Sequence, residues 1–344
     1  MKSSFLPVLT VVGVLFALWY AAAVWLNADW TYDKATRSGE TVTATSLVAD
    51  TWAQKKPKLP APHQVASEIW DTTVMKKVTS KRSLVYHSWI TLSATLLGFG
   101  MGTLLGVLLA VGIVFNRVMD MSVMPWVIAS QTIPILAIAP MIIVVLNAVG
   151  VSGLLPKAMI SMYLSFFPVV VGMVKGLRSP DQMQLDQMRT WHASAGQTFW
   201  KLRLPASMPY FFTSLKIAMA ASLVGAIIGE LPTGAVAGLG ARLLAGSYYG
   251  QTIQIWSALI MAAALAALLM GMCYGPLNPT STKILHGLGA DRRQPLIFSV
   301  KQTGVPVAGV IVGMSLPALT VMFGWRWAFG VFAVAAILVA LAIQ

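Results

Sequence analysis

Long runs of apolar residues recur along almost the whole chain, and this feature limits the possible folds more than any other. About 20 apolar residues cross a bilayer as a helix. The predicted spans are residues 5–26, 90–114, 122–148, 154–176, 209–231, 252–274, 298–321 and 325–343. Only 10% of the residues are charged, against about 25% in soluble domains. The sequence therefore predicts an all-α, polytopic membrane helix bundle.

The distribution of basic residues predicts the orientation of this bundle. Short loops rich in Lys and Arg stay on the cytoplasmic side of a membrane. The 177–208 loop carries four of them, at Arg178, Arg189, Lys201 and Arg203. We therefore place this loop and the N-terminus in the cytoplasm, in a bacterial inner membrane. The first span, residues 1–26, has no clear cleavage site after it and is interpreted as an uncleaved anchor.

Residues 27–89 are predicted to form an external arm. Prolines at positions 57, 60 and 62 imply an extended segment, and Val65, Ile69 and Trp70 follow at helical spacing. A solvated linker and a contact surface for a partner are both compatible with this composition.

Small residues and prolines indicate how the core, residues 90–274, packs. Gly98, Gly102, Gly106 and Ala110 recur every four residues, which lets a second helix backbone approach closely. The spans also hold Pro125, Pro134, Pro140 and Pro168, and such prolines leave irregular backbone that faces protein or a cavity. We interpret these helices as lining a pathway. The polar candidates for that pathway are Gln131, Asn147, Ser165 and Glu230.

Several classes of site are excluded by the residue inventory. The chain has one cysteine, Cys273, and four scattered histidines, so neither a disulfide framework nor a zinc spacing exists. It lacks the G-x-x-x-x-G-K-[ST] run of a phosphate-binding loop. We expect no catalytic residue, metal or bound cofactor in this chain.

The stretch MRTWHASAGQTFWKLRLP (188–205) stands out between two apolar runs. Leu185, Met188, Trp191, Ala195 and Phe199, followed by Leu202, fall on one helical stripe. The pattern predicts two short amphipathic helices or a single bent one. Three uses are open: resting on lipid headgroups, folding back on the bundle, or docking into a groove of a soluble partner.

This loop resembles the coupling-loop signature of ABC-importer permeases, which reads Glu-Ala-Ala, three residues, Gly, nine residues, Ile-x-Leu-Pro. Asp186 stands at the Glu position, His192 at the Gly, and Leu202 at the Ile, before Leu204-Pro205. Gln187 and Met188 replace the two alanines. Histidine tolerates positive φ better than most non-glycine residues, so a turn is still expected there; Gly196 is a second candidate for the bend.

Further stretches over residues 58–272 resemble the permeases of nitrate/sulfonate/taurine-type importers. They include QTIPILAIAPMIIV, SFFPVVVG and AGLGARLL. The GELPTGAVAGLGARLLAGSYYGQ stretch is most similar to permeases for pyrimidine (thiamine-precursor) or riboflavin uptake. The resemblance implies a homodimer that forms the substrate pathway, a separate cytoplasmic ATPase and a periplasmic substrate-binding protein.

The resemblance also assigns residues to the ATPase contact. In this assignment Trp191, Phe199 and Leu202 anchor the groove of the ATPase, and Arg189 and Lys201 line its charged rim. The full set is Asp186, Arg189, Trp191, His192, Ala193, Gly196, Phe199, Lys201, Leu202, Leu204 and Pro205.

The C-terminal part, residues 275–344, resembles instead a fragment of a major-facilitator transporter, through stretches such as RRQPLIFSVKQTGVPVAGVIVG. A secondary transporter, a non-functional fusion product and a non-transporting scaffold are therefore alternatives to the importer permease. The amphipathic loop favours the permease, because a secondary carrier does not need it, and the proline-interrupted spans have no use in a scaffold.

Overall fold

The computed structural model describes residues 5–39, 41–231 and 237–274, and these residues form helices and connecting turns without a strand. Its long helices are α1 (Phe5–Ser38), α4 (Leu84–Phe115), α7 (Leu154–Leu177), α10 (Leu204–Gly229) and α12 (Thr252–Tyr274). Their shorter neighbours are α2 (Ala44–Ala53), α3 (Pro62–Trp70), α5 (Arg117–Ser130), α6 (Ile135–Ala148), α8 (Gln182–Thr190), α9 (Ala195–Thr198) and α11 (Leu239–Tyr248), with π-helical turns η1 (Asp71–Met75) and η2 (Phe199–Arg203). The predicted spans at 298–321 and 325–343 lie outside the described residues.

Most predicted spans are confirmed, but three have different bounds. The span predicted at 5–26 continues in α1 to Ser38, so the first residues of the predicted arm are helical. The predicted 122–148 span is divided into α5 and α6, which are bent by 103° around a short break. Pro134 at this break lacks a backbone N–H and disfavours helical geometry in the preceding residue, which interrupts the helix there. The predicted 209–231 span begins much earlier, because α9, η2 and α10 form one helical stretch from Ala195 to Gly229.

Helices α4, α7 and α10 form the centre of the bundle. The predicted small-residue stripe is confirmed, since Gly98, Gly102, Gly106 and Ala110 are all buried on α4. They face α7: a Cβ added to Gly106 would lie 2.7 Å from the Cβ of Val169. Because glycine has no side chain, the two helix backbones approach each other closely at this contact.

Helices α7 and α10 pack closely in the same way, through glycines that do not belong to the predicted small-residue stripe. A Cβ on Gly176 would lie 2.8 Å from the Cβ of Ser207, and one on Gly225 would lie 2.7 Å from the Cα of Ser161. The hydroxyl of Ser222 donates to the Thr95 carbonyl at 2.7 Å, which joins α10 to α4. The three helices therefore pack as one block.

Gly106→Ala is expected to destabilise this block, whereas Gly100→Ala on the same helix is not. The added methyl group at position 106 overpacks the contact with α7, which costs about 1–3 kcal/mol; nothing lies within 4 Å of a Cβ at position 100. Thermal unfolding of both variants in detergent checks the difference. Equal unfolding temperatures would contradict the close packing of α4 on α7.

The arm that the sequence predicts to be external is packed and is therefore not a solvated linker. Its prolines Pro57, Pro60 and Pro62 are buried. The side chain of Asn27 on α1 accepts from the Lys58 N–H at 2.7 Å and donates to the Leu59 carbonyl at 2.8 Å. On the other side, Thr252 of α12 donates to the Pro57 carbonyl. The predicted extended segment and the helix after it, α3, are both confirmed.

Candidate functional site

The loop between α7 and α10 contains two capped helices. The carboxylate of Asp181 accepts the Gln184 N–H at 2.9 Å at the start of α8. The hydroxyl of Ser194 accepts the Gln197 N–H at 3.3 Å at the start of α9. Both pairs form capping boxes, which satisfy backbone groups that a helix leaves free at its first turn. Of the two predicted alternatives, separate helices rather than one bent helix are present, but only α8 is a short independent helix, because α9 continues into α10.

His192 forms the turn between these helices. Its φ is +52°, the one positive φ of a non-glycine residue in the described ranges. The His192 N–H donates to the Arg189 carbonyl at 2.9 Å, and the Ala193 N–H donates to the Met188 carbonyl at 3.0 Å. This pair of bonds is the Schellman motif, in which glycine is the usual residue with positive φ. The predicted turn at His192 is confirmed, and Gly196 lies inside α9.

Large apolar side chains on this loop are exposed. Met183 is 80% exposed and Trp191 67%, and Trp200 in η2 is 68% exposed. Phe199, by contrast, lies against the bundle, with its ring centroid 5.6 Å from that of Phe115 on α4. Met183, Trp191 and Trp200 are therefore available to a partner, while Phe199 joins the loop to the bundle.

The other residues that the signature assigns to the loop divide between its surface and its base. Asp186 and Arg189 pair at 3.0 Å on the exposed side of α8. The remaining members are Ala193, Leu202 and Leu204, which are half-buried, and Lys201 and Pro205, which are exposed. An exposed ion pair of this kind contributes little to stability, so it leaves both charges available for another contact.

The base of the loop is joined to the bundle at both ends. Arg203 donates to the Leu177 carbonyl, the last of α7, at 3.1 Å. Arg178 and Asp120 on α5 form an ion pair at 2.8 Å. The helix that starts at Ala195 continues through η2 to Gly229, so the loop and α10 form one continuous element.

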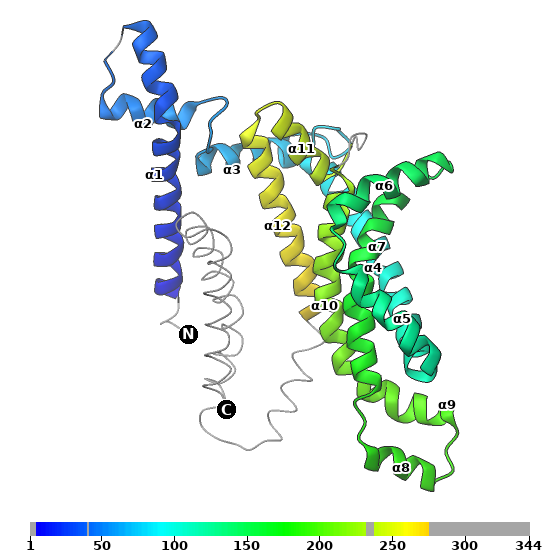
Figure 1. The fold of residues 1–344 in the computed structure, drawn as a ribbon. Coiled ribbons are helices and arrows are strands. Elements are labelled where there is room, and N and C mark those ends of the chain that lie inside the picture. Colours follow the sequence, from blue (N-terminus) through cyan, green and yellow to red (C-terminus); the bar gives the residue numbers. More distant parts are fainter. Residues whose placement is uncertain (1–4, 40, 232–236, 275–344) are drawn as a thin grey trace. The chain divides into compact units, whose positions relative to one another are not determined.

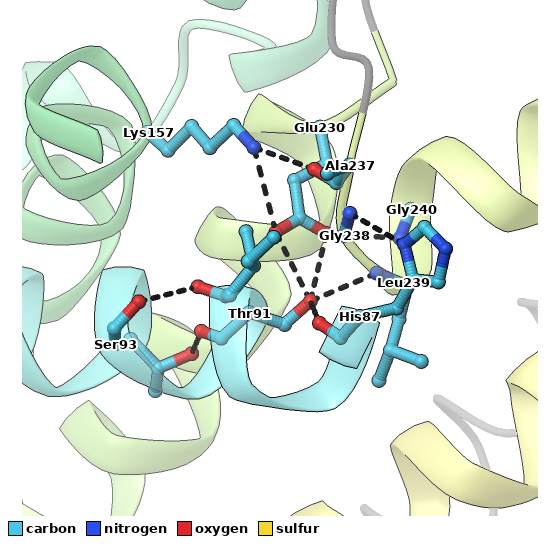
Figure 2. Close-up of polar contacts among 11 residues, drawn as sticks. His87, Thr91, Ser93, Lys157, Glu230, Ala237, Gly238, Leu239 and Gly240 are labelled. Carbon is cyan, nitrogen blue, oxygen red and sulfur yellow. Dashed lines mark hydrogen bonds and ion pairs between the residues drawn. The ribbon is translucent and has the colours of Figure 1, made fainter. Parts of the chain in front are cut away.

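A buried polar cluster lies where that helix ends. The carboxylate of Glu230 is fully buried, and its oxygens accept the Thr91 hydroxyl at 2.9 Å and the Gly240 N–H at 2.9 Å. Lys157 at the start of α7 lies 3.9 Å from the carboxylate and donates to the Ala237 carbonyl at 2.7 Å. Figure 2 shows that α4, α7, α10 and the chain before α11 meet at this carboxylate.

The first turn of α11 is capped by the same group of side chains. The N–H groups of Gly238 and Leu239 donate to His87 Nδ1 and to the Thr91 hydroxyl, both at 2.9 Å. Because Nδ1 accepts a proton donor, the ring proton is on Nε2, which donates to the Lys81 carbonyl at 3.0 Å. His87 is therefore neutral here, and Thr91, His87 and Glu230 satisfy three successive backbone donors at a helix N-terminus.

The polar cluster and the α8–α9 loop lie at opposite ends of the bundle (Figure 1). Lys157 is near the start of α7 and the loop follows its end. With 24 residues, α7 is about 36 Å long, which is enough to cross the hydrocarbon core of a bilayer. Two polar sites thus terminate one close-packed pair of helices.

The predicted pathway residues are placed differently from one another. Gln131 and Asn147 are exposed on the bent pair α5–α6, and Glu230 is in the polar cluster. Ser165 is buried between α7 and α4, where its hydroxyl donates to the Gly98 carbonyl at 3.3 Å. The contacts of Ser165 are thus those of a helix-packing residue. Among the described residues, no group of His, Cys, Asp and Glu has the arrangement of a metal site.

Comparison with known proteins gives the family. Residues 102–275, half of the chain, match the family described as "Binding-protein-dependent transport system inner membrane component". The formylaminopyrimidine transport permease protein ThiX of Halalkalibacterium halodurans is 33% identical over 53% of this chain and 68% of its own length. A probable ABC transporter permease protein of Haemophilus influenzae is 29% identical over 60% of this chain and 79% of its own.

A more distant similarity is to a protein described as the putative aliphatic sulfonates transport permease protein SsuC of Bacillus subtilis. It is 24% identical over 56% of this chain and 68% of its own length. A solved structure of the MetNI methionine ABC transporter, in inward-facing conformations, is 19% identical and covers 63% of this chain and 96% of that chain, with a TM-score of 0.46. The chain belongs to the family of binding-protein-dependent transport system inner membrane components and is a multi-pass, membrane-embedded permease subunit of an ABC importer.

Proposed function

We propose that this permease couples substrate passage to ATP hydrolysis by a separate ATPase, and that the α8–α9 loop is the contact. The observation that carries the proposal is the position of Met183 and Trp191. These apolar side chains are exposed on a rigidly capped loop, and the helix after the loop continues to the polar cluster at the far end of the bundle. Buried aromatic anchors of this kind dominate interface energies.

This proposal fixes the orientation of the chain. The loop and the N-terminus lie in the cytoplasm, and the Glu230 cluster lies at the external end, where a periplasmic binding protein delivers substrate. ATP and Mg²⁺ are bound by the ATPase, since this sequence lacks a phosphate-binding loop. The inner-membrane family description supports this setting.

Two copies of the chain form the pathway in this proposal. The bent pair α5–α6 supports it, because this pair exposes Trp126, Leu136, Met141 and Val144, each more than 60% accessible. Gln131 at the bend and Asn147 near the end of α6 are the polar groups that the same surface offers to a substrate. Non-helical backbone at such a bend is tolerated where protein or a cavity covers it.

The names of the relatives suggest which substrates to test first. Formylaminopyrimidine and riboflavin appear in the names of the permeases ThiX of Halalkalibacterium halodurans and RibX of Chloroflexus aurantiacus. We propose a small pyrimidine-like ring as the first candidate, and sulfonates and nitrate as the second. The secondary-transporter and fusion alternatives rest on residues 275–344, which lie outside the described residues.

Purification of the affinity-tagged chain from its own membrane in mild detergent tests the proposed function. We expect the preparation to contain a subunit with a phosphate-binding loop and to hydrolyse Mg-ATP. A cysteine at Met183, in a Cys273→Ser background, is expected to cross-link to that subunit. A chain that purifies without such a subunit, and whose uptake activity in proteoliposomes needs an ion gradient but not ATP, would contradict it.

A further inference from the structure

A surface between α3 and α4 has no role in the proposed coupling. We call residues 70–82 the collar; they include η1 and the turn that leads into α4. Four apolar side chains of the collar are exposed: Trp70 by 60%, Val74 by 56%, Met75 by 73% and Val78 by 58%. An apolar cluster of this kind marks a contact with a partner or a membrane.

The opposite face of the collar and α3 is packed against the bundle. Val65 is buried on α3, and Ile69 packs on the cluster of Leu84, Leu239 and Ala258. The buried hydroxyl of Thr72 donates to the Glu68 carbonyl at 2.5 Å. Contacts of α3 with α12 and of η1 with α4 hold the segment in place. Its exposed apolar face is therefore presented in one fixed direction.

Four basic residues lie in the second half of the collar, on both sides of Val78. Lys77, Lys81 and Arg82 are exposed, and Lys76 is half-buried. Two acidic residues lie at the opposite end, Asp71 in η1 and Glu68 in α3. Burial raises the pKa of Glu68, and the nearby guanidinium of Arg242 partly offsets that shift. The basic end of the collar is thus separated from its acidic end by the apolar side chains.

The collar is continuous with a membrane-spanning surface. Leu84, two residues after Arg82, begins α4, which is long and apolar enough to cross a membrane. Trp89, in the second turn of α4, is 66% exposed. Tryptophan is enriched at the headgroup level of a bilayer, and Lys and Arg near helix ends reach toward it. Exposed Trp70 and Trp89 thus lie on either side of the start of α4 in the sequence.

We infer that the collar is a membrane-interface anchor, which inserts Trp70, Val74, Met75 and Val78 among lipid headgroups and binds the phosphates of anionic phospholipids through Lys77, Lys81 and Arg82. A basic, amphipathic segment with exposed aromatic and aliphatic residues binds such surfaces by apolar burial plus charge attraction. Continuity with α4 favours a bilayer over a soluble protein as the occupant. The anchor fixes the depth of α3 and of the packed arm before it.

Spin-label accessibility tests the position of the collar. Single cysteines replace Val78 or, as a matched control, Ser67 on the exposed face of α3, in the full chain with Cys273→Ser. In vesicles of phosphatidylcholine and phosphatidylglycerol, the label at position 78 is expected to be more accessible to oxygen than to a water-soluble nickel reagent. The label at position 67 should show the reverse preference. A water-accessible label at position 78 would overturn the inference.

The charge contribution needs a second measurement. Each basic residue near an anionic surface strengthens the binding affinity about fivefold. The double variant Lys77→Gln/Lys81→Gln is therefore expected to lower the preference for phosphatidylglycerol over phosphatidylcholine by roughly 25-fold at most. Lipid retention in native mass spectrometry measures this preference, with Lys55→Gln/Lys56→Gln on the arm as the control. Unchanged lipid preference would overturn the charge part of the inference. Protection of Val78→Cys from both reagents, only when a soluble binding protein is added, would identify a protein partner instead.

Discussion

Glu230→Ala is expected to destabilise the protein by about 3–5 kcal/mol, the loss typical of breaking a buried ion pair by removing one partner. The alanine removes the acceptor of the Thr91 hydroxyl and of the Gly240 N–H, and it leaves Lys157 with the Ala237 carbonyl alone. Thermal unfolding in detergent at a fixed scan rate measures the loss. Substrate uptake is expected to fall with it, because α4, α7, α10 and α11 meet at this carboxylate.

Two variants separate the charge of Glu230 from its shape. Glu230→Gln keeps a hydrogen-bond acceptor and the volume of the side chain. Its unfolding temperature should therefore lie between those of the wild-type protein and Glu230→Ala. Glu230→Leu combined with Lys157→Met removes both charges, a change that is often neutral for the ion pair alone. It still leaves the buried Gly240 N–H without its acceptor, so it should recover only part of the stability lost in Glu230→Ala. If Glu230→Ala unfolds at the wild-type temperature, the cluster does not hold this end of the bundle together.

Trp191→Asp is expected to release the proposed ATPase partner while the chain still inserts and folds. Trp191 is 67% exposed in this chain, so the substitution costs the fold little, whereas the loss of a buried aromatic anchor costs an interface at least about 2 kcal/mol. That value corresponds to a roughly 30-fold weaker complex. Co-purified ATPase and its rate of ATP hydrolysis measure the effect.

Two matched substitutions accompany this experiment. Tyr248→Asp changes an equally exposed aromatic residue, 73% accessible, at the end of α11, and it should leave the ATPase bound. Phe199→Asp is expected to lower the thermal stability of the chain itself, because the Phe199 ring packs on Phe115. A Trp191→Asp protein that retains its ATPase would exclude this side chain as an anchor.

Much of the fold follows from local sequence patterns. Apolar runs predict α4, α7 and α12, and the four-residue spacing of Gly98, Gly102 and Gly106 predicts a close helix contact, because both signals lie within one helix. The turn at His192 followed from the resemblance to the coupling-loop signature, in which His192 stands at the glycine position, together with the tolerance of histidine for positive φ. The amphipathic stripe likewise predicts the helices of the α8–α9 loop.

Other features depend on contacts between distant parts of the chain. Glu230 contacts Thr91, which is 139 residues away in the sequence. His87 and Lys157 also lie near Glu230, but no spacing in the sequence connects either of them with this residue. The same limit applies to Phe199, whose apolar character is equally compatible with the bundle and with a partner. The bend between α5 and α6 was marked by Pro134, but proline alone does not give its angle.

In the proposed mechanism, the capped loop that begins the long α9–α10 helix faces the compartment where ATP is hydrolysed. A single cysteine in place of Met183, whose side chain is 80% exposed, tests this orientation most directly in right-side-out spheroplasts. A second variant, Lys56→Cys on the arm, provides the position for comparison. A membrane-impermeant maleimide is predicted to label position 56 in intact spheroplasts and position 183 only after lysis. Labelling of position 183 before lysis would contradict the account.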